Sequence, residues 1–165
     1  MAGAIQFTKL NCNVATGDSA VKEYSDPRMH SAEHILNQTM VRLFNCGRCF
    51  RAHIEKKKSK CDYHFDRPLT DEEIGNIESK VNQVIESDLP VLEEFLSRKE
   101  ARAQFNLDRL PEEAGDRIRI ITVGDYDACP CIGPHVKSTR EIGGFRILSS
   151  SFEDDVLRIR FKLRG

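Results

Sequence analysis

Two pairs of side chains with metal-binding chemistry stand out in this sequence because both pairs have the same spacing. His30 and His34 are four residues apart, so on a helix their rings would emerge on one face, about 40° apart at 3.6 residues per turn. Cys131 and His135 are also four apart, and Gly133-Pro134 between them forces a turn. Thiolates and imidazoles are ligands that Zn²⁺ prefers. We therefore predict a single Zn²⁺ site that takes its ligands from both pairs.

Each pair alone also has an ordinary structural explanation. His30 and His34 could be half-buried histidines at the edge of a core, and Cys131 could be a core cysteine beside a turn histidine, His135. The chain has only five histidines, so two such pairs are hard to attribute to coincidence. If all four side chains bind at once, the ion is closed and cannot also activate water. The sequence therefore leaves open whether the metal is catalytic or structural.

Two further groups near the first helix have reactive side chains. Glu33 lies between the paired histidines and is a candidate general base; the alternative is a surface glutamate. Cys46 and Cys49 form a C-x-x-C pair, which with Cys61 or His53 could form a second zinc site or a redox pair. The simpler interpretation is a helix end with two incidental thiols.

A basic turn offers a candidate contact for a nucleic-acid backbone, although a solvated turn is the simpler explanation. Its lysines are Lys56, Lys57, Lys58 and Lys60, and the same basic run includes Arg48, Arg51 and Arg67. Lys plus Arg number 25 against 26 for Asp plus Glu, and the formal net charge is −1. Bulk charge therefore does not indicate nucleic-acid binding, and a local patch would have to provide it.

Cap residues mark the two helices that must position these groups. Asp26-Pro27 predicts the start of the first helix, and Asn45 and Gly47 predict its end. A capping box over residues 70–73 predicts the start of the second. The first helix has an apolar stripe of Met29, Ala32, Leu36, Met40 and Leu43, and the second has one of Ile74, Ile77, Val81, Val84 and Ile85.

Strand patterns complete the expected fold. Residues 156–163 alternate strictly between apolar and basic side chains, as a half-buried strand requires, and residues 145–152 would pair with them antiparallel. Weaker patterns predict one or two strands within residues 4–24, a hairpin over 48–66, strands at 91–95 and 118–123, and a short helix at 98–106. Together these elements predict an α+β domain in which an antiparallel or mixed sheet packs with two main helices.

The bulk properties fit one globular domain over residues 1–165. Hydrophobic residues make up 39% and charged residues 31% of the chain. The N-terminus has no signal-peptide pattern, and no apolar run approaches the ~20 residues that span a bilayer. Six cysteines without a secretion signal favour a reducing compartment. We therefore expect a cytoplasmic protein with no membrane contact.

The two metal-binding motifs, taken together, resemble those of a known family. Residues 30–34 read His-Ser-Ala-Glu-His and residues 131–135 read Cys-Ile-Gly-Pro-His, similar to the editing domain shared by alanyl- and threonyl-tRNA synthetases and by free-standing alanyl-tRNA editing proteins. The resemblance extends to three further segments, which are Phe65-Asp66, residues 70–74 and residues 139–143. It covers the chain from about residue 24 to the end.

This resemblance implies an activity and a partner. The expected activity is hydrolysis, in trans, of the ester that links a wrong amino acid to the acceptor end of tRNA, with serine on tRNA(Ala) or tRNA(Thr) as the candidate substrate. The four lysines of the basic turn become candidate tRNA contacts, and contact with a synthetase is possible. Gly133 and Thr139 are candidate substrate-binding residues, and Arg119 stands near the position of the threonyl branch's catalytic lysine.

The sequence departs from each branch of the family. Gly133-Pro134-His135-Val136 resembles the threonyl branch, whereas Glu141-Ile142-Gly143 resembles the alanyl branch. Cys129 stands where the threonyl branch usually has an acid. Because of Cys129 and Arg119, an inactive module that binds tRNA or a synthetase is one alternative. An inverted zinc peptidase with the H-x-x-E-H pattern is another, but it leaves Cys131 and His135 unexplained.

Overall fold

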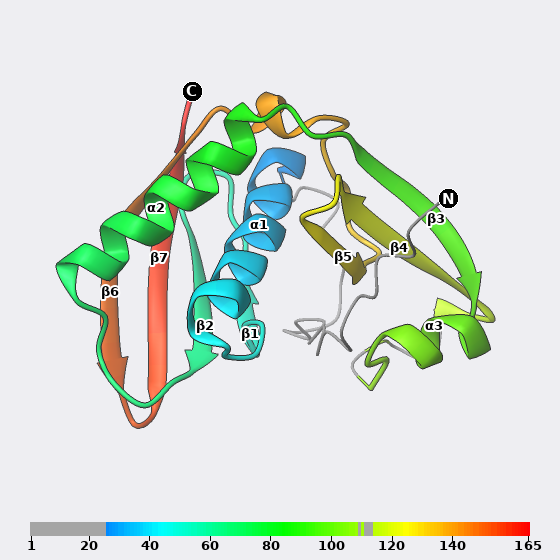
Figure 1. The fold of residues 1–165 in the computed structure, drawn as a ribbon, viewed down its shortest axis with the longest axis horizontal. Helices are drawn as coiled ribbons and strands as arrows, with labels where there is room; N and C mark the ends of the chain where they lie inside the picture. Colours follow the sequence, from blue (N-terminus) through cyan, green and yellow to red (C-terminus); the bar gives the residue numbers. More distant parts are fainter. Residues whose placement is uncertain (1–25, 109, 111–113) are drawn as a thin grey trace, which may run out of the picture.

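The structure is a computed structural model that describes residues 26–108, 110 and 114–165. The strands predicted within residues 4–24 lie outside the described residues. The described chain forms three α-helices and two antiparallel sheets, which confirms the α+β fold. The strands are divided between two sheets, and helix α1 (Pro27–Phe44) lies between them (Figure 1).

Helix α1 begins and ends where its cap residues predict. The Asp26 carboxylate accepts a hydrogen bond from the Arg28 N–H at 2.9 Å, and Pro27 occupies the first turn. Asn45 takes the left-handed conformation at the C-cap, with φ 51°. The apolar stripe is buried as far as Met40. The prediction was wrong for Leu43, which lies in the last turn and is 45% exposed.

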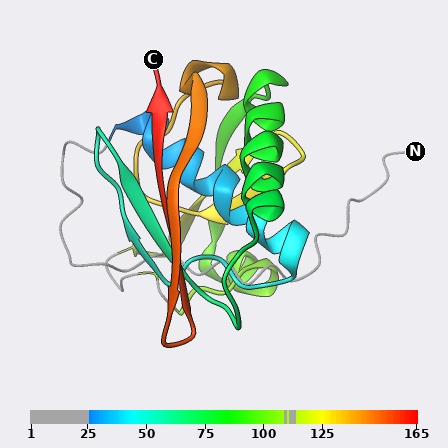
Figure 2. The same cartoon turned by 90° about the vertical axis from the view of Figure 1, so that its left-hand side faces the viewer.

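The larger sheet has four strands in the order β1-β2-β7-β6. The predicted first hairpin is confirmed as β1 (Arg51–His53) and β2 (Ser59–His64), and the C-terminal hairpin as β6 (Gly144–Glu153) and β7 (Val156–Arg164). On the inward face of β7, Leu157, Ile159 and Phe161 are fully buried, and Leu163 is partly buried at the edge of the core. Figure 2 shows this sheet in front, with α1 passing behind it.

Helix α2 (Asp71–Glu86) covers the same core and starts at the predicted capping box of Thr70 and Glu73. Ile77, Val81, Val84 and Ile85 of its predicted stripe are buried, and Ile74 packs at the edge. Within the described ranges, no helix combines the length and the apolar character that crossing a membrane requires.

The second sheet has three strands in the order β3-β4-β5. Strands β3 (Val91–Ser97) and β4 (Arg117–Val123) and helix α3 (Arg98–Gln104) were predicted, whereas β5 (Asp127–Pro130) was missed. Alternation along β4 turns Ile118 and Ile120 toward the α3 side, and Ile121 and Val123 toward the α1 side. This sheet is important for the site because β5 leads directly into Cys131.

Candidate metal centre

The structure brings together the four side chains that the spacing singled out. His30 and His34 come from α1, and Cys131 and His135 from the loop between β5 and the short 3₁₀ helix η2 (Thr139–Ile142). One ligand atom from each lies within 4.8 Å of the others. The Cys131 Sγ is 3.4 Å from the Nε2 atoms of both His30 and His135. Residues a hundred positions apart therefore form one cluster.

The spacing of these donor atoms fits a tetrahedral zinc ion. With Zn–S near 2.3 Å and Zn–N near 2.0–2.1 Å, neighbouring sulfur and nitrogen ligands should be about 3.5 Å apart. The two S···N distances of 3.4 Å agree with this value. The donor set of three imidazoles and one thiolate is also one that Zn²⁺ prefers over hard cations.

Each of the three imidazoles has a polar partner at its Nδ1 atom. The Nδ1 of His30 lies 3.2 Å from the Pro134 carbonyl oxygen, and that of His135 lies 2.9 Å from the Ser31 hydroxyl. The Nδ1 of His34 faces a carboxylate oxygen of Asp127 at 3.6 Å. The Pro134 carbonyl oxygen and the Asp127 carboxylate can only accept, so they favour a proton on Nδ1 of His30 and His34 and leave Nε2 as the atom that would bind a metal.

Asp127 is held in turn by Arg48. Asp127 was not singled out from the sequence. Arg48 was predicted to belong to a basic patch for the tRNA backbone, and that prediction was wrong because its side chain is buried in this ion pair. Both are buried, and the guanidinium contacts the two carboxylate oxygens at 2.7 and 3.2 Å. Burial alone would raise the pKa of Asp127, but the charges of Arg48 and His34 outweigh it and lower the pKa to about 2. A permanent carboxylate therefore lies behind His34. The period-two spacing of Asp127, Cys129 and Cys131 would place all three on one face of a strand, but β5 is only four residues long, so this spacing alone could not identify the strand.

The charges of the cluster favour a thiolate at Cys131. Burial would raise the pKa of this thiol, but the charge of His34 and hydrogen bonds from the imidazoles hold the pKa well below its usual value. Burial would lower the pKa of His34, yet Cys131 and Asp127 raise it to about 10. The pKa of His135 falls to about 4 because of burial and the neighbouring His34 charge. These shifts favour a Cys131 thiolate beside a protonated His34, whose proton a metal would have to displace.

Glu33 is buried beside the cluster and is not the surface glutamate of the alternative interpretation. One carboxylate oxygen lies 3.8 Å from the Nε2 of His30 and 3.9 Å from the Nε2 of His34. The other accepts a hydrogen bond from the Asn37 amide at 2.6 Å. Asn37 also accepts from the Tyr63 hydroxyl at 2.8 Å. A buried network therefore fixes the Glu33 carboxylate next to the imidazoles.

Cys49 has Cys61, not Cys46, as its thiol neighbour. Cys49, Cys61 and Glu33 form a second group whose ligand atoms lie within 4.8 Å of one another, and the Cys49 thiol is 3.5 Å from Glu33. The hydrogen bond that the Cys61 thiol donates to Cys49, together with burial, raises the pKa of Cys61 well above its usual value. Cys46 is half-buried and donates to the Met40 carbonyl. Cys61 is therefore a neutral thiol at physiological pH.

Arg119 and Gly133 shape the loop that carries Cys131. The Arg119 guanidinium donates to the carbonyl oxygens of Cys131 and Gly133 at 3.1 and 2.7 Å, and to the Glu93 carboxylate at 2.6 Å. A Cβ atom at Gly133 would overlap the imidazole of His30. The Gly133 N–H points toward the Cys131 sulfur at 3.4 Å. Both residues therefore adjoin the cluster, with Arg119 bonded to the loop backbone.

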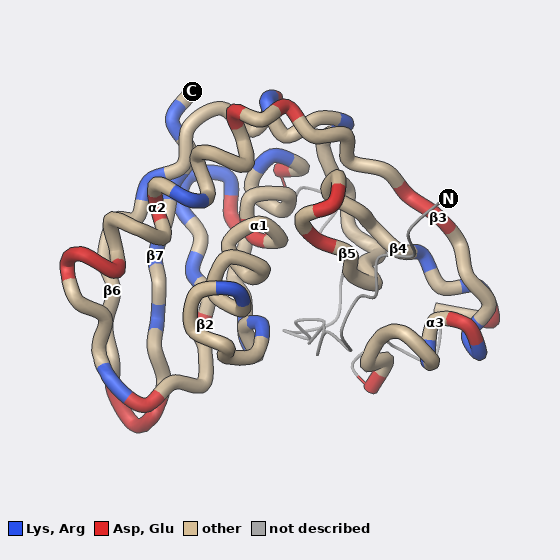
Figure 3. The backbone as a smooth tube through the Cα atoms, in the orientation of Figure 1, with Lys and Arg blue, Asp and Glu red and all other residues tan. Residues whose placement is uncertain are grey.

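The structure does not bring Thr139 or the lysines into the cluster. The Thr139 hydroxyl is buried 3.0 Å from the Val84 carbonyl at the end of α2 and accepts from the Leu89 N–H at 2.9 Å. Lys56, Lys57 and Lys58 are exposed on the turn between β1 and β2, and Lys60 is half-buried on β2. Figure 3 shows further basic residues along β7, the neighbour of β2. The predicted roles of these residues in binding substrate and tRNA remain predictions.

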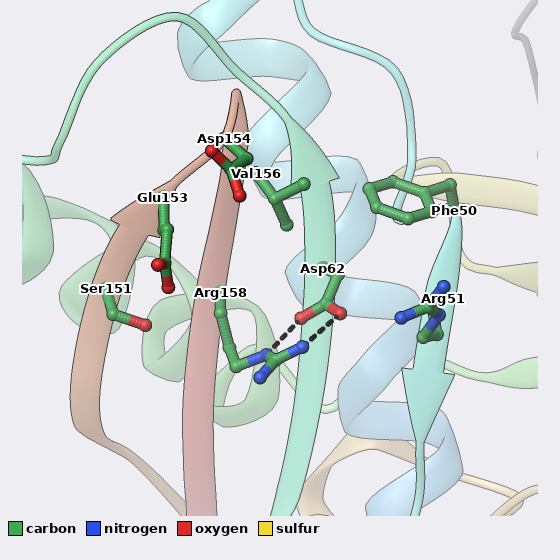
Figure 4. A pocket seen from close by; sticks show the side chains of 8 residues that line it. All are labelled: Phe50, Arg51, Asp62, Ser151, Glu153, Asp154, Val156 and Arg158. Carbon is green, nitrogen blue, oxygen red and sulfur yellow. Dashed lines mark hydrogen bonds and ion pairs between the residues drawn. The ribbon is translucent and has the colours of Figure 1, made fainter.

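A pocket of about 260 Å³ lies apart from this centre, on the outer face of the four-stranded sheet. Figure 4 shows an ion pair inside it, in which Arg158 donates to both carboxylate oxygens of Asp62 at 2.6 and 2.8 Å. The pair neutralises the charges that would otherwise attract a ligand. None of the four metal-binding side chains lines the pocket, whose walls are Phe50, Arg51, Asp62, Ser151, Glu153, Asp154, Val156 and Arg158.

The fold and the cluster define an α+β domain with a candidate metal centre of three histidines and one cysteine between a helix and a strand end. Residues 118–160, which carry half of that cluster, match the family described as Threonyl and Alanyl tRNA synthetase second additional domain. The chain belongs to this family, which confirms the resemblance of its motifs.

Similar proteins include several alanine–tRNA ligases. The chain is 35% identical over 148 residues to that of Aeropyrum pernix, 34% over 131 residues to that of Pseudothermotoga lettingae, and 33% over 150 residues to that of Fervidobacterium nodosum. These alignments cover 85%, 79% and 87% of this chain, but only 16%, 15% and 17% of the ligases. The chain thus spans about a sixth of the length of these relatives.

Proposed function

We propose that this chain is an aminoacyl-tRNA deacylase that acts in trans and hydrolyses the ester of serine mischarged onto tRNA(Ala). The similarity to alanine–tRNA ligases supports the choice of tRNA. The observation that carries the catalytic part is the cluster itself, in which three imidazoles with polar partners at Nδ1 converge with the Cys131 sulfur. The donor set would hold Zn²⁺ through His30, His34, Cys131 and His135. An ion bound by all four side chains would be closed, so one ligand would have to be weakly bound or displaced before Zn²⁺ could act as a Lewis acid on an ester carbonyl or hold an amino group.

Glu33 is the group best placed to handle the proton of the attacking water. Its carboxylate adjoins His30 and His34, and Asn37 fixes its orientation. A general base must lie within reach of the water that attacks the ester carbon. In this proposal Glu33 accepts a proton from that water, and the proton is then delivered to the ribose oxygen that leaves.

The remaining residues of the site orient the loop. Arg119 fixes the carbonyl oxygens of the Cys131–Gly133 segment, and Gly133 leaves room for the His30 ring. Arg119 is therefore a positioning residue in this mechanism. A pocket that hydrogen-bonds the serine hydroxyl would reject alanine strongly, because alanine would leave the buried polar partners unsatisfied.

The test is release of labelled serine from mischarged tRNA(Ala) and tRNA(Thr) by the isolated 165-residue chain. We expect turnover on tRNA(Ala) that is lost in His34→Ala and reduced in Glu33→Gln. Faster turnover on tRNA(Thr) would overturn the choice of tRNA. Intact tRNA binding without turnover by zinc-loaded wild type would overturn the activity and favour a binding module.

A further inference from the structure

A large aromatic side chain is exposed on the sheet that carries the Cys131 loop. Phe95 lies on β3 and is 48% exposed. A single exposed apolar side chain is ordinary on a protein surface, so the position of Phe95 relative to the metal centre is the informative observation. Leu92 on the same strand is 60% exposed, but it is an odd number of residues away and points to the opposite face.

The strand register places Phe95 on the same face as the metal centre. Phe95 is directly opposite Arg119 in the β3–β4 ladder. The Cys131 N–H donates to the Arg119 carbonyl at 3.1 Å, which extends the β4–β5 ladder by one step and sets Cys131 opposite Arg119. Directly opposed residues share a face of a sheet. Phe95, Arg119 and Cys131 therefore form a row across the sheet, two interstrand spacings or about 10 Å long.

Cationic side chains flank the aromatic ring. The Arg117 guanidinium lies over Phe95, 5.5 Å from the ring centroid. Arg119 lies between Phe95 and the loop, with Glu93 and two loop carbonyls as its partners. An exposed ring with a neighbouring guanidinium on a sheet face is the arrangement that proteins use to stack unpaired bases and contact the attached phosphates.

We propose that Phe95 and Arg117 form the binding site for the terminal, unpaired nucleoside of the tRNA, with the base stacked on Phe95. The row from Phe95 to Cys131 is about as long as a nucleoside, so a base on Phe95 sets the ribose over Arg119 and its aminoacyl ester at the cluster. The inference rests on the proposed function, because it identifies how the ester substrate is held.

Three serine esters distinguish binding of the terminal base from the hydrolysis step. Two contain that base, seryl-tRNA(Ala) and 3′-O-seryladenosine, and the third, serine methyl ester, has no base. We expect Phe95→Ala to raise KM for the first two esters by about tenfold, because one stacking contact is lost, and to leave kcat unchanged. Hydrolysis of the methyl ester should not change. Phe95→Tyr keeps the ring and should restore KM, and Leu92→Ala is the matched control from the opposite face.

Two results would overturn the inference while leaving the deacylase activity intact. One is an equal loss of kcat/KM for the methyl ester and for seryladenosine in Phe95→Ala, which would mean that Phe95 shapes the reaction centre. The other is an unchanged KM for seryladenosine. If wild type hydrolyses none of the esters, the proposed function fails. Titration with the trinucleotide CCA then tests the stacking site independently of hydrolysis. Binding that weakens in Phe95→Ala but not in Leu92→Ala would support the stacking site, and no binding by wild type would overturn it.

Discussion

Two groups of potential metal ligands lie side by side under α1, and they differ in chemistry more than in geometry. The histidine–cysteine cluster comprises His30, His34, Cys131 and His135, and the dithiol group comprises Glu33, Cys49 and Cys61. In both, the ligand atoms lie within 4.8 Å of one another. Glu33 adjoins both groups, with one oxygen toward the imidazoles and the other toward Cys49.

The difference lies in the protonation that each environment favours. Around Cys131, imidazole donors and the His34 charge lower the thiol pKa, so a ligand-ready thiolate is present. Around Cys61, a thiol neighbour and burial raise the pKa. A metal must displace the proton of any thiol it binds, which costs more where the pKa is high. Proximity of donor atoms alone therefore does not identify a metal site, and we expect one ion per chain, in the histidine–cysteine cluster.

The largest expected effect is loss of zinc when a ligand of the histidine–cysteine cluster is removed. Removal of a side chain that only contacts a metal ligand typically weakens metal binding by roughly 10- to 100-fold. Cys131→Ser removes a ligand itself and should weaken zinc binding by more than this. Cys49→Ser in the dithiol group should leave the stoichiometry at one. Metal analysis and competition with a chelator measure both. Two ions per wild-type chain, with one lost in Cys49→Ser, would break the distinction between the groups.

A smaller loss is expected when the support behind His34 is weakened. Asp127→Asn removes the carboxylate charge that faces Nδ1 while keeping the side-chain shape, so zinc affinity should fall by about 10- to 100-fold. Asp62→Asn, in the outer-face pocket, changes the other buried aspartate that pairs with an arginine and should have no effect on zinc. Circular dichroism checks that both variants fold. Equal zinc affinities in the two variants would show that the Asp127 carboxylate does not strengthen zinc binding.

Alkylation rates compare the thiols directly in metal-free protein. Cys131 should react with iodoacetamide at pH 7 at a rate that barely changes between pH 6 and 8, because its pKa is lowered and the thiolate already predominates. Cys46 is more exposed, but burial raises its pKa to about 11, so its rate should rise about tenfold per pH unit. Peptide mapping by mass spectrometry gives both rates. A Cys131 rate that rose about tenfold per pH unit between pH 6 and 8 would contradict the assigned thiolate, whereas the absolute rates also depend on how exposed each thiol is.

Local signals in the sequence were sufficient for the helices and for the candidate ligands. Asp26 and Asn45 cap α1 because their side chains or backbone satisfy its end groups in any context. His30 and His34 share a face because helix geometry dictates it. These properties depend only on residues within a few positions, so they can be predicted from one sequence.

The partners contributed by distant strands could not be predicted in the same way. Strand β5 is four residues long and is defined by its pairing with β4, so alternation within it is too short to detect. The contact of Asp127 with His34 follows from that pairing, and so does the position of Arg119. Cys61 meets Cys49 only because β2 pairs with β1 beneath α1. The C-x-x-C spacing drew attention to Cys46, which the fold directs elsewhere.

The smallest expected effect concerns what the dithiol group does if it holds no metal. Its thiols are fully buried between α1 and the larger sheet, so they should act as packing groups. Cys61→Ala would remove buried volume and lower the free energy of unfolding by about 1 kcal/mol, with zinc affinity unchanged. Urea unfolding with and without a chelator measures this difference. If the chelator destabilised wild type but no longer affected Cys61→Ala, the stabilising ion would lie at the dithiol group, and the assignment of the single metal site would have to be reversed.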